Sequence, residues 1–115
     1  MTKAEESILD NLFRKLIIAR DGHCIICMGK INLKAYRLYS EIVFPALRWD
    51  PVNGITLCND HADSMKKDIN AIKSAIGACR LDCLKNHSQH LKPYMDFGYI
   101  KECLKEAIAA FGGKL

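Results

Sequence analysis

Two short pairs of residues have the types and the spacing that bind a metal ion. Cys24 and Cys27 form a Cys-x2-Cys pair, and Cys58 and His61 form a Cys-x2-His pair thirty residues further along the chain. In a tight turn the backbone wraps so that two such sulfurs converge, and at a helix start residues i and i+3 share a face. Three thiolates and one imidazole satisfy tetrahedral Zn²⁺ and leave no position for a reacting water. The spacing therefore predicts a structural zinc ion.

Other interpretations of these side chains stay open at the level of sequence. The residues could form two unrelated buried pairs or a disulfide, with His61 an ordinary residue at a helix start. His23 is a competing ligand, but adjacent residues rarely reach one ion, so we expect it in the loop.

A second group of ligating residues, Cys79, Cys83, His87 and His90, lies in a stretch with helical spacing. On a continuous helix the outer two would be about 16 Å apart, so all four cannot bind one ion. Cys79 and Cys83 also continue an apolar seam, which favours core packing over an i, i+4 metal pair. We expect Cys103 in the core as well.

A small set of helices and strands must position these residues. Apolar spacing predicts a helix over residues 3–20, which Asp21-Gly22 ends, and the first cysteine pair follows in a tight turn. Residues 31–44 are β-rich and predict one or two strands, and Ile55-Thr56-Leu57 predicts a short strand before Cys58. A long helix is expected from about residue 59 to 90, and a last helix from about 95 to 111.

Composition limits the class of protein. Of the 115 residues, 50% are hydrophobic and 26% charged, as in ordinary globular proteins. No repeat or linker divides the chain, so we expect a single domain over residues 1–115. The start lacks a signal-peptide pattern and no apolar run approaches the ~18 residues of a membrane span. We therefore expect a soluble, cytoplasmic protein with no membrane partner, in which clustered cysteines hold metal rather than form disulfides.

Three stretches around the predicted metal site together resemble a known family. They are Leu38-Tyr39-Ser40-Glu41-Ile42-Val43, Leu47-Arg48-Trp49-Asp50-Pro51-x-Asn53 and Leu57-Cys58-x2-His61, with Cys24-x2-Cys27 before them. In this order they are similar to the zinc-containing HNH endonucleases, especially members from bacteria and phages. The similarity covers about residues 20–67. It implies a treble-clef ββα core with bound zinc, in a bacterium or a phage-infected host. It gives no support to the helical segments at 3–20 and 68–111, which are expected from apolar spacing. Together the core and these segments predict an α+β fold.

The resemblance also implies which residues would cleave nucleic acid, and two of the three positions depart from the family pattern. Asn53 matches the central asparagine, which orients the general base, although Asn53-Gly54 is also a common tight-turn dipeptide. Glu41 occupies the position of the general-base histidine, and Ala62 that of a metal-binding residue. A glutamate with a pKa of about 4.3 is a poorer base at neutral pH than an imidazole with a pKa of about 6.5, and alanine binds no cation. Asp60 or Asp63 could lend a ligand to magnesium or manganese.

Basic residues in and beyond this core predict contact with phosphate groups. The candidates are Arg48, Lys66, Lys67, Lys73 and Arg80, and the net charge of +4 permits a polyanionic partner. The alternative is an ordinary solvated helix face, because acidic residues interrupt the stripe. We expect Trp49 to be a packing anchor over the cysteine turn rather than a base-stacking residue.

Three functions follow from these features. The first is a nuclease-derived zinc module, impaired in catalysis, that binds nucleic acid (DNA rather than RNA) or a partner that processes nucleic acid. The second is an active endonuclease that uses Glu41 with magnesium or manganese. The third is a phage-type protein-interaction or anti-defence factor that docks through the helices around Pro93.

Overall fold

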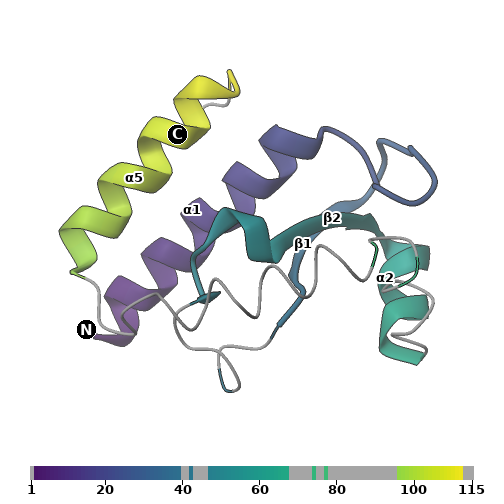
Figure 1. Ribbon diagram of the computed structural model, residues 1–115, viewed down its shortest axis with the longest axis horizontal. Helices are drawn as coiled ribbons and strands as arrows, with labels where there is room; N and C mark the ends of the chain where they lie inside the picture. The colour runs from purple at the N-terminus through teal and green to yellow at the C-terminus, as the bar shows by residue number, and fades with distance from the viewer. Residues whose placement is uncertain are drawn as a thin grey trace.

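The protein is a small α+β domain with three helices and a two-stranded sheet in the part of the chain that the structure describes (Figure 1). The computed structural model describes residues 2–39, 42, 47–67, 74, 77 and 96–112. The elements in these ranges are α1 (Lys3–Asp21), β1 (Leu33–Arg37), the 3₁₀ helix η2 (Pro51–Asn53), β2 (Gly54–Cys58), α2 (Asn59–Lys67) and α5 (Phe97–Ala110). No helix in these ranges has the length and apolar character needed to cross a bilayer.

Helix α1 begins and ends where the sequence predicts. Thr2 and Glu5 form a capping box, in which the Thr2 hydroxyl accepts from the Glu5 N–H and the Glu5 carboxylate accepts from the Thr2 N–H. Gly22 ends the helix with a φ of 71°, a left-handed conformation that glycine adopts without strain. The N–H of Gly22 donates to the Ile18 carbonyl and so satisfies the last turn.

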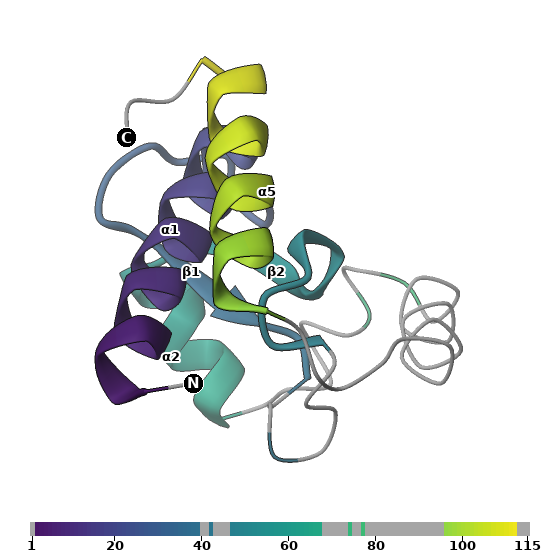
Figure 2. The ribbon, with the colours of Figure 1, turned by 90° about the vertical axis from the view of Figure 1, so that its left-hand side faces the viewer.

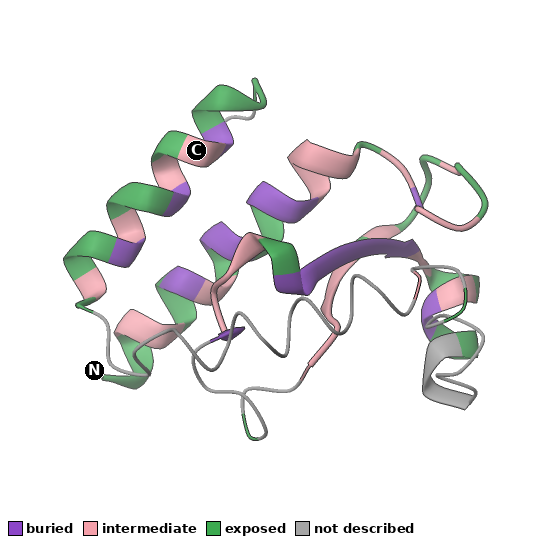
Figure 3. Cartoon of the chain, viewed as in Figure 1, coloured by how far each residue is buried: buried purple, intermediate pink, exposed green. Residues whose placement is uncertain are grey.

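The sheet lies between α1 and the half of the molecule formed by α2 and the turn that carries Cys24 and Cys27, here called the cysteine turn. Strands β1 and β2 pair antiparallel, from Leu33 opposite Cys58 to Arg37 opposite Gly54. One face of β2 contacts α1: the Thr56 hydroxyl donates to the Ile17 carbonyl, and a Cβ on Gly54 would overlap the Ile17 side chain. The other face packs against α2 and the cysteine turn, and β2 is buried along nearly its whole length (Figure 3). Only glycine at position 54 therefore lets α1 approach the sheet so closely.

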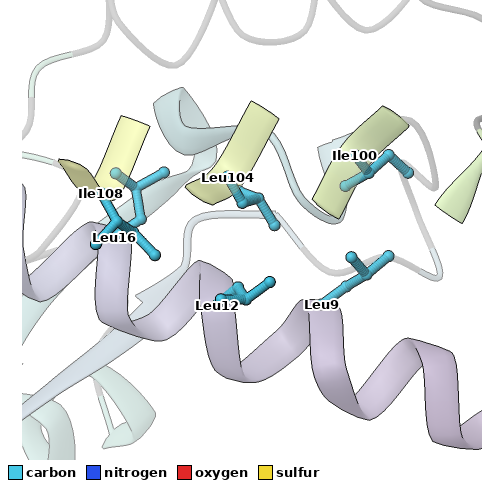
Figure 4. Packing of buried hydrophobic residues seen from close by; sticks show 6 residues of the cluster. All are labelled: Leu9, Leu12, Leu16, Ile100, Leu104 and Ile108. Carbon is cyan, nitrogen blue, oxygen red and sulfur yellow. The ribbon is translucent and has the colours of Figure 1, made fainter. Parts of the chain in front are cut away.

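Helices α1 and α5 lie side by side and share a core (Figure 2). Three aliphatic residues of each helix face the other helix and pack directly against one another (Figure 4). They are Leu9, Leu12 and Leu16 from α1 and Ile100, Leu104 and Ile108 from α5. Asp96 caps α5 by accepting from the Tyr99 N–H. The predicted last helix is confirmed.

Two sequence predictions about the C-terminal part are wrong. Gly77 is not helical and has a φ of 98°, so a single continuous helix from 59 to 90 does not form. Cys103 is exposed rather than in the core, because its neighbour Leu104 occupies the inward-facing position of α5 and one residue turns the helix by about 100°. The second group of predicted ligands, Cys79, Cys83, His87 and His90, lies outside the described residues.

Candidate metal centre

A tight turn after α1 brings the first two cysteines together. The N–H of Cys24 donates to the Gly29 carbonyl at 2.8 Å, and the N–H of Met28 donates to the Cys24 carbonyl at 2.9 Å. Met28 has a φ of 65°, which lets the chain reverse after Cys27. The Ile25 N–H donates to the Thr56 carbonyl, so the turn is anchored to the free edge of β2. This bond positions Cys24 and Cys27 above the end of that strand.

The second pair lies where β2 passes into α2. Cys58 ends the strand and His61 lies three residues later, in the first turn of the helix. Its ring Nδ1 is 3.2 Å from the Cys58 sulfur and 3.7 Å from the Cys24 sulfur, and the Cys27 and Cys58 sulfurs are 3.8 Å apart. All four ligand atoms lie within 4.8 Å of one another. The structure thus brings together every predicted zinc ligand.

Two of these distances are close to the edges of a coordination tetrahedron, and the whole group lies near enough for one ion. With Zn–S bonds of about 2.3 Å, two sulfurs on a tetrahedral ion are ~3.8 Å apart, which is the separation of Cys27 and Cys58. All four described cysteines are free, so the disulfide interpretation is wrong. The interpretation as two unrelated pairs is also wrong, because the pairs converge. His23 is not part of the cluster; its Nδ1 lies 2.9 Å from the Cys24 carbonyl oxygen.

The surroundings of the cysteines favour one thiolate before any metal binds. Burial raises the pKa of Cys24, but backbone N–H groups of Cys27, Cys58 and Ile26 and the Cys27 thiol lower it, to about 6. The Gly29 N–H lowers the pKa of Cys27. Burial and the neighbouring Cys24 and Cys58 sulfurs outweigh this effect, so the pKa of Cys27 lies above its ordinary value. The buried member of the cluster is therefore the first thiolate, which is the form that binds metal.

The residues that the resemblance placed in a catalytic site have other contacts or lie outside the described chain. Asn53 is fully buried; its side chain accepts from the Tyr39 N–H and donates to the Tyr39 and Leu47 carbonyls at 3.0 and 3.1 Å. The tight-turn interpretation of Asn53-Gly54 is wrong, because Gly54 is extended with a φ of −107°. Glu41 lies outside the described residues. Ala62 is buried against Ile55 and Leu57, so its Cβ faces the core rather than a cleft.

Arg48 and Trp49 belong to an internal polar cluster around Asp10. The Asp10 carboxylate accepts from Trp49 Nε1 at 2.9 Å, from Arg37 Nη2 at 2.8 Å and from Arg48 Nη2 at 3.2 Å. Arg48 also pairs with Glu6, and its guanidinium lies over the Trp49 ring. Arg48, a predicted phosphate contact, thus forms ion pairs within the fold. The expectation for Trp49 is wrong, because its ring packs against the α1–α5 core rather than over the cysteine turn.

Sequence reasoning missed Asp10 and Arg37. No local pattern could have indicated the cluster, because its members are separated by up to 39 positions. Burial raises the pKa of Asp10, but hydrogen bonds from Trp49 and Arg48 and the charges of Arg37 and Arg48 outweigh it and hold the pKa below its ordinary value. The cluster fastens the loop before η2 to α1.

The other predicted phosphate contacts cannot be placed in the same way. Lys66 and Lys67 lie at the end of α2, where their side chains are outside the described part, and Lys73 and Arg80 lie outside it altogether. The exposed charged residues between positions 11 and 39 are all basic; they are Arg14, Lys15, Lys30 and Lys34.

No family model, no curated protein and no solved structure matches this chain.

Proposed function

We propose that the Cys24, Cys27, Cys58 and His61 cluster binds a structural zinc ion. The observation that carries the proposal is the convergence of four protein ligand atoms within 4.8 Å, the number of ligands that a tetrahedral ion needs. Three cysteine sulfurs and one histidine nitrogen are a ligand set that favours zinc. With four protein ligands the ion has no open position for the water or substrate that a catalytic zinc needs. The ion would hold the cysteine turn against β2 and the start of α2.

We further propose that this zinc module is an HNH-like treble clef that binds nucleic acid, DNA in particular, without cleaving it. Charge supports the binding. Between residues 11 and 39 there are six basic residues and one acidic residue, a formal charge of +5 against +4 for the whole chain. Its one acid, Asp21, already pairs with Arg20, so the charge that this segment presents to solvent is uniformly positive. Such a surface attracts the phosphate backbone regardless of sequence.

The contacts of the candidate catalytic residues support the absence of cleavage. Both polar atoms of the Asn53 amide are engaged by backbone groups, so the amide contributes to folding the loop. Ala62 has no ligand atom and is buried. Asp60 and Asp63 are exposed on α2, but two carboxylates without a partner base make a weak hydrolytic site.

Metal content tests the first part of the proposal. Elemental analysis of untagged protein should give about one zinc per chain. Two zinc ions per chain would add a second site, for which Cys79, Cys83, His87 and His90 are the candidates. Protein that is folded and carries no zinc, or carries iron in its place, would contradict the proposal.

Anisotropy of a labelled DNA duplex over a salt series tests the second part. Binding should weaken steeply with salt, and Lys15→Glu with Lys30→Glu should lower the log–log salt slope by about one unit per residue. Lys3→Glu with Lys105→Glu changes the net charge equally and serves as the control. Equal losses in both double variants, or no binding at any salt, would contradict nucleic-acid contact.

Magnesium- or manganese-dependent plasmid nicking that disappears in Glu41→Ala would show an active endonuclease instead.

A further inference from the structure

A surface groove runs between α1 and the outer side of the sheet. Its volume is about 480 Å³ and its lining consists of Arg14 and Ile18 from α1 and Leu33, Lys34, Ala35 and Tyr36 from β1. Successive side chains of a strand point to opposite faces, so a hollow over one face would contact alternate residues. Four consecutive residues line this groove. The groove therefore lies along the edge of β1 that is opposite β2.

The outward backbone groups of this edge have no hydrogen-bond partner among the described residues. The Leu38 N–H donates to the Asn53 carbonyl and continues the register of the two strands. Because hydrogen-bonded and non-bonded pairs alternate in an antiparallel ladder, the N–H and C=O groups of Leu33 and Ala35 then point away from β2. No residue that the structure describes hydrogen-bonds to them. An open edge of this kind can accept another strand.

The two walls of the groove each carry one cation. Ala35 lies opposite Thr56 in the sheet, on the face that α1 covers, so Arg14 and Ile18 stand on that side. Lys34 and Tyr36 belong to the other face by the alternation of the strand. Arg14 donates to the neutral Asn11 side chain, and within the described ranges neither Arg14 nor Lys34 forms an ion pair. A strand placed in the groove would thus meet a positive charge above and below it.

We propose that this edge binds an extended acidic segment of a partner protein, which adds to β1 as a third strand. Backbone groups of Leu33 and Ala35 supply the pairing, as in other cases of strand addition. Adjacent residues of an added strand point to opposite faces, so two consecutive acidic residues would reach Arg14 and Lys34 at once. Apolar neighbours of these acids would contact Ile18 on one side and Tyr36 on the other. The proposal does not depend on the zinc ion or on nucleic-acid binding.

A fluorescein-labelled peptide of sequence Thr-Val-Glu-Glu-Val-Ile-Thr tests the proposal by anisotropy with the whole, metal-loaded protein. It should bind, and a peptide with the same composition but one residue between the two glutamates should bind roughly two- to fivefold more weakly, because both acids then face one wall. Arg14→Glu with Lys34→Glu should weaken the first peptide further. Absence of binding, or equal binding of the two peptides, would overturn the proposal.

Backbone pairing is tested separately with N-methylated peptides. Methylation of every second amide in one frame should abolish binding, while methylation in the other frame should leave it, since only alternate amides face β1. Equal effects in both frames would exclude strand addition.

A protein variant gives a matched test of the edge. Ala35→Pro removes an outward-facing donor that the sheet does not use, and should abolish peptide binding but keep DNA binding and metal content. Should this variant unfold, the comparison of the two methylated frames tests the edge by itself.

Full displacement of the peptide by single-stranded DNA together with no effect of methylation would assign the groove to nucleic acid and overturn a peptide partner. Loss of DNA binding in Lys15→Glu with Lys30→Glu, with peptide binding kept, separates the two proposals.

Discussion

The two halves of the molecule are held together in different ways. The helix pair α1–α5 has a core of six large aliphatic residues that face one another across the interface. Among the described residues, the half formed by the cysteine turn, β2 and α2 has two large fully buried aliphatic residues, Ile55 and Leu57, beside Cys24 and Ala62, and its other apolar side chains, such as Ile25, are only partly buried. Within the described residues, the first half thus has the larger buried aliphatic core, and the second depends more on partly buried side chains.

The difference shows what the four ligands contribute to the fold. Burial of a large aliphatic side chain stabilises by about 1.5–3 kcal/mol, so Ile55 and Leu57 together supply only a few kcal/mol. A structural zinc ion in a small peptide contributes roughly 10–16 kcal/mol at neutral pH. Metal binding at Cys24, Cys27, Cys58 and His61 would therefore replace a hydrophobic core in this half. Since α1 packs on the sheet that this half holds in place, the helix pair would gain from it as well.

Removal of one ligand has the largest expected effect on this comparison. Cys58→Ser should release the metal and abolish the near-UV circular dichroism of the folded protein, because the remaining core of that half is too small. Cys103→Ser, which removes an exposed thiol from α5, should keep both the metal and the spectrum. A Cys58→Ser protein that stays folded without metal would show that the two halves do not differ in the way described.

The same side-chain deletion in each half gives the next effect in size. Leu16→Ala should lower the free energy of unfolding by about 2–5 kcal/mol, because Leu16 is completely buried between α1 and α5. The chelator concentration that removes the metal from the Leu16→Ala variant should equal that for the unaltered protein. Leu57→Ala removes the same side-chain volume from the half formed by the cysteine turn, β2 and α2. It should therefore also lower the chelator concentration that releases the metal. The measurements are urea unfolding and metal release to a chromogenic chelator; equal chelator sensitivity of the two variants would contradict the separation.

The features that the sequence predicted depend on residues close together in the chain. Both ligand pairs, the extent of α1 up to its end at Gly22 and the apolar face of α5 follow from short local patterns. Local geometry favours such features, so rules of spacing can find them.

The features that escaped prediction depend on contacts between distant residues. Asn53-Gly54 has the sequence of a tight turn, yet the approach of α1 to Gly54 and the bonds of Asn53 to Tyr39 and Leu47 hold it in another conformation. The pairing of Arg48 with Asp10, 38 positions away, has no signal in the local sequence either. No rule of spacing contains these pairings, because they follow from how α1 packs on the loop before η2.

The Asp10 cluster provides the smallest of the three effects and joins the helix pair to the loop before η2. Asp10→Asn should lower the free energy of unfolding at pH 7 by about 1–3 kcal/mol, since it removes the charge that Arg37 and Arg48 share. The pKa of Asp10 is lowered by folding, so this stabilisation is present above the unfolded pKa of about 3.9 and is lost as the pH falls through the folded pKa.

The difference between the unaltered protein and Asp10→Asn should therefore be constant above about pH 5 and shrink in more acidic solution. Urea unfolding at several pH values measures it, with Glu106→Gln, an exposed carboxylate of α5, as the control that should show little change. A difference that persists undiminished to pH 3 would mean that the Asp10 side chain acts through packing and its bond to Trp49 rather than through charge. In that case the loop would be fastened to α1 by the indole, and the arginines would be secondary.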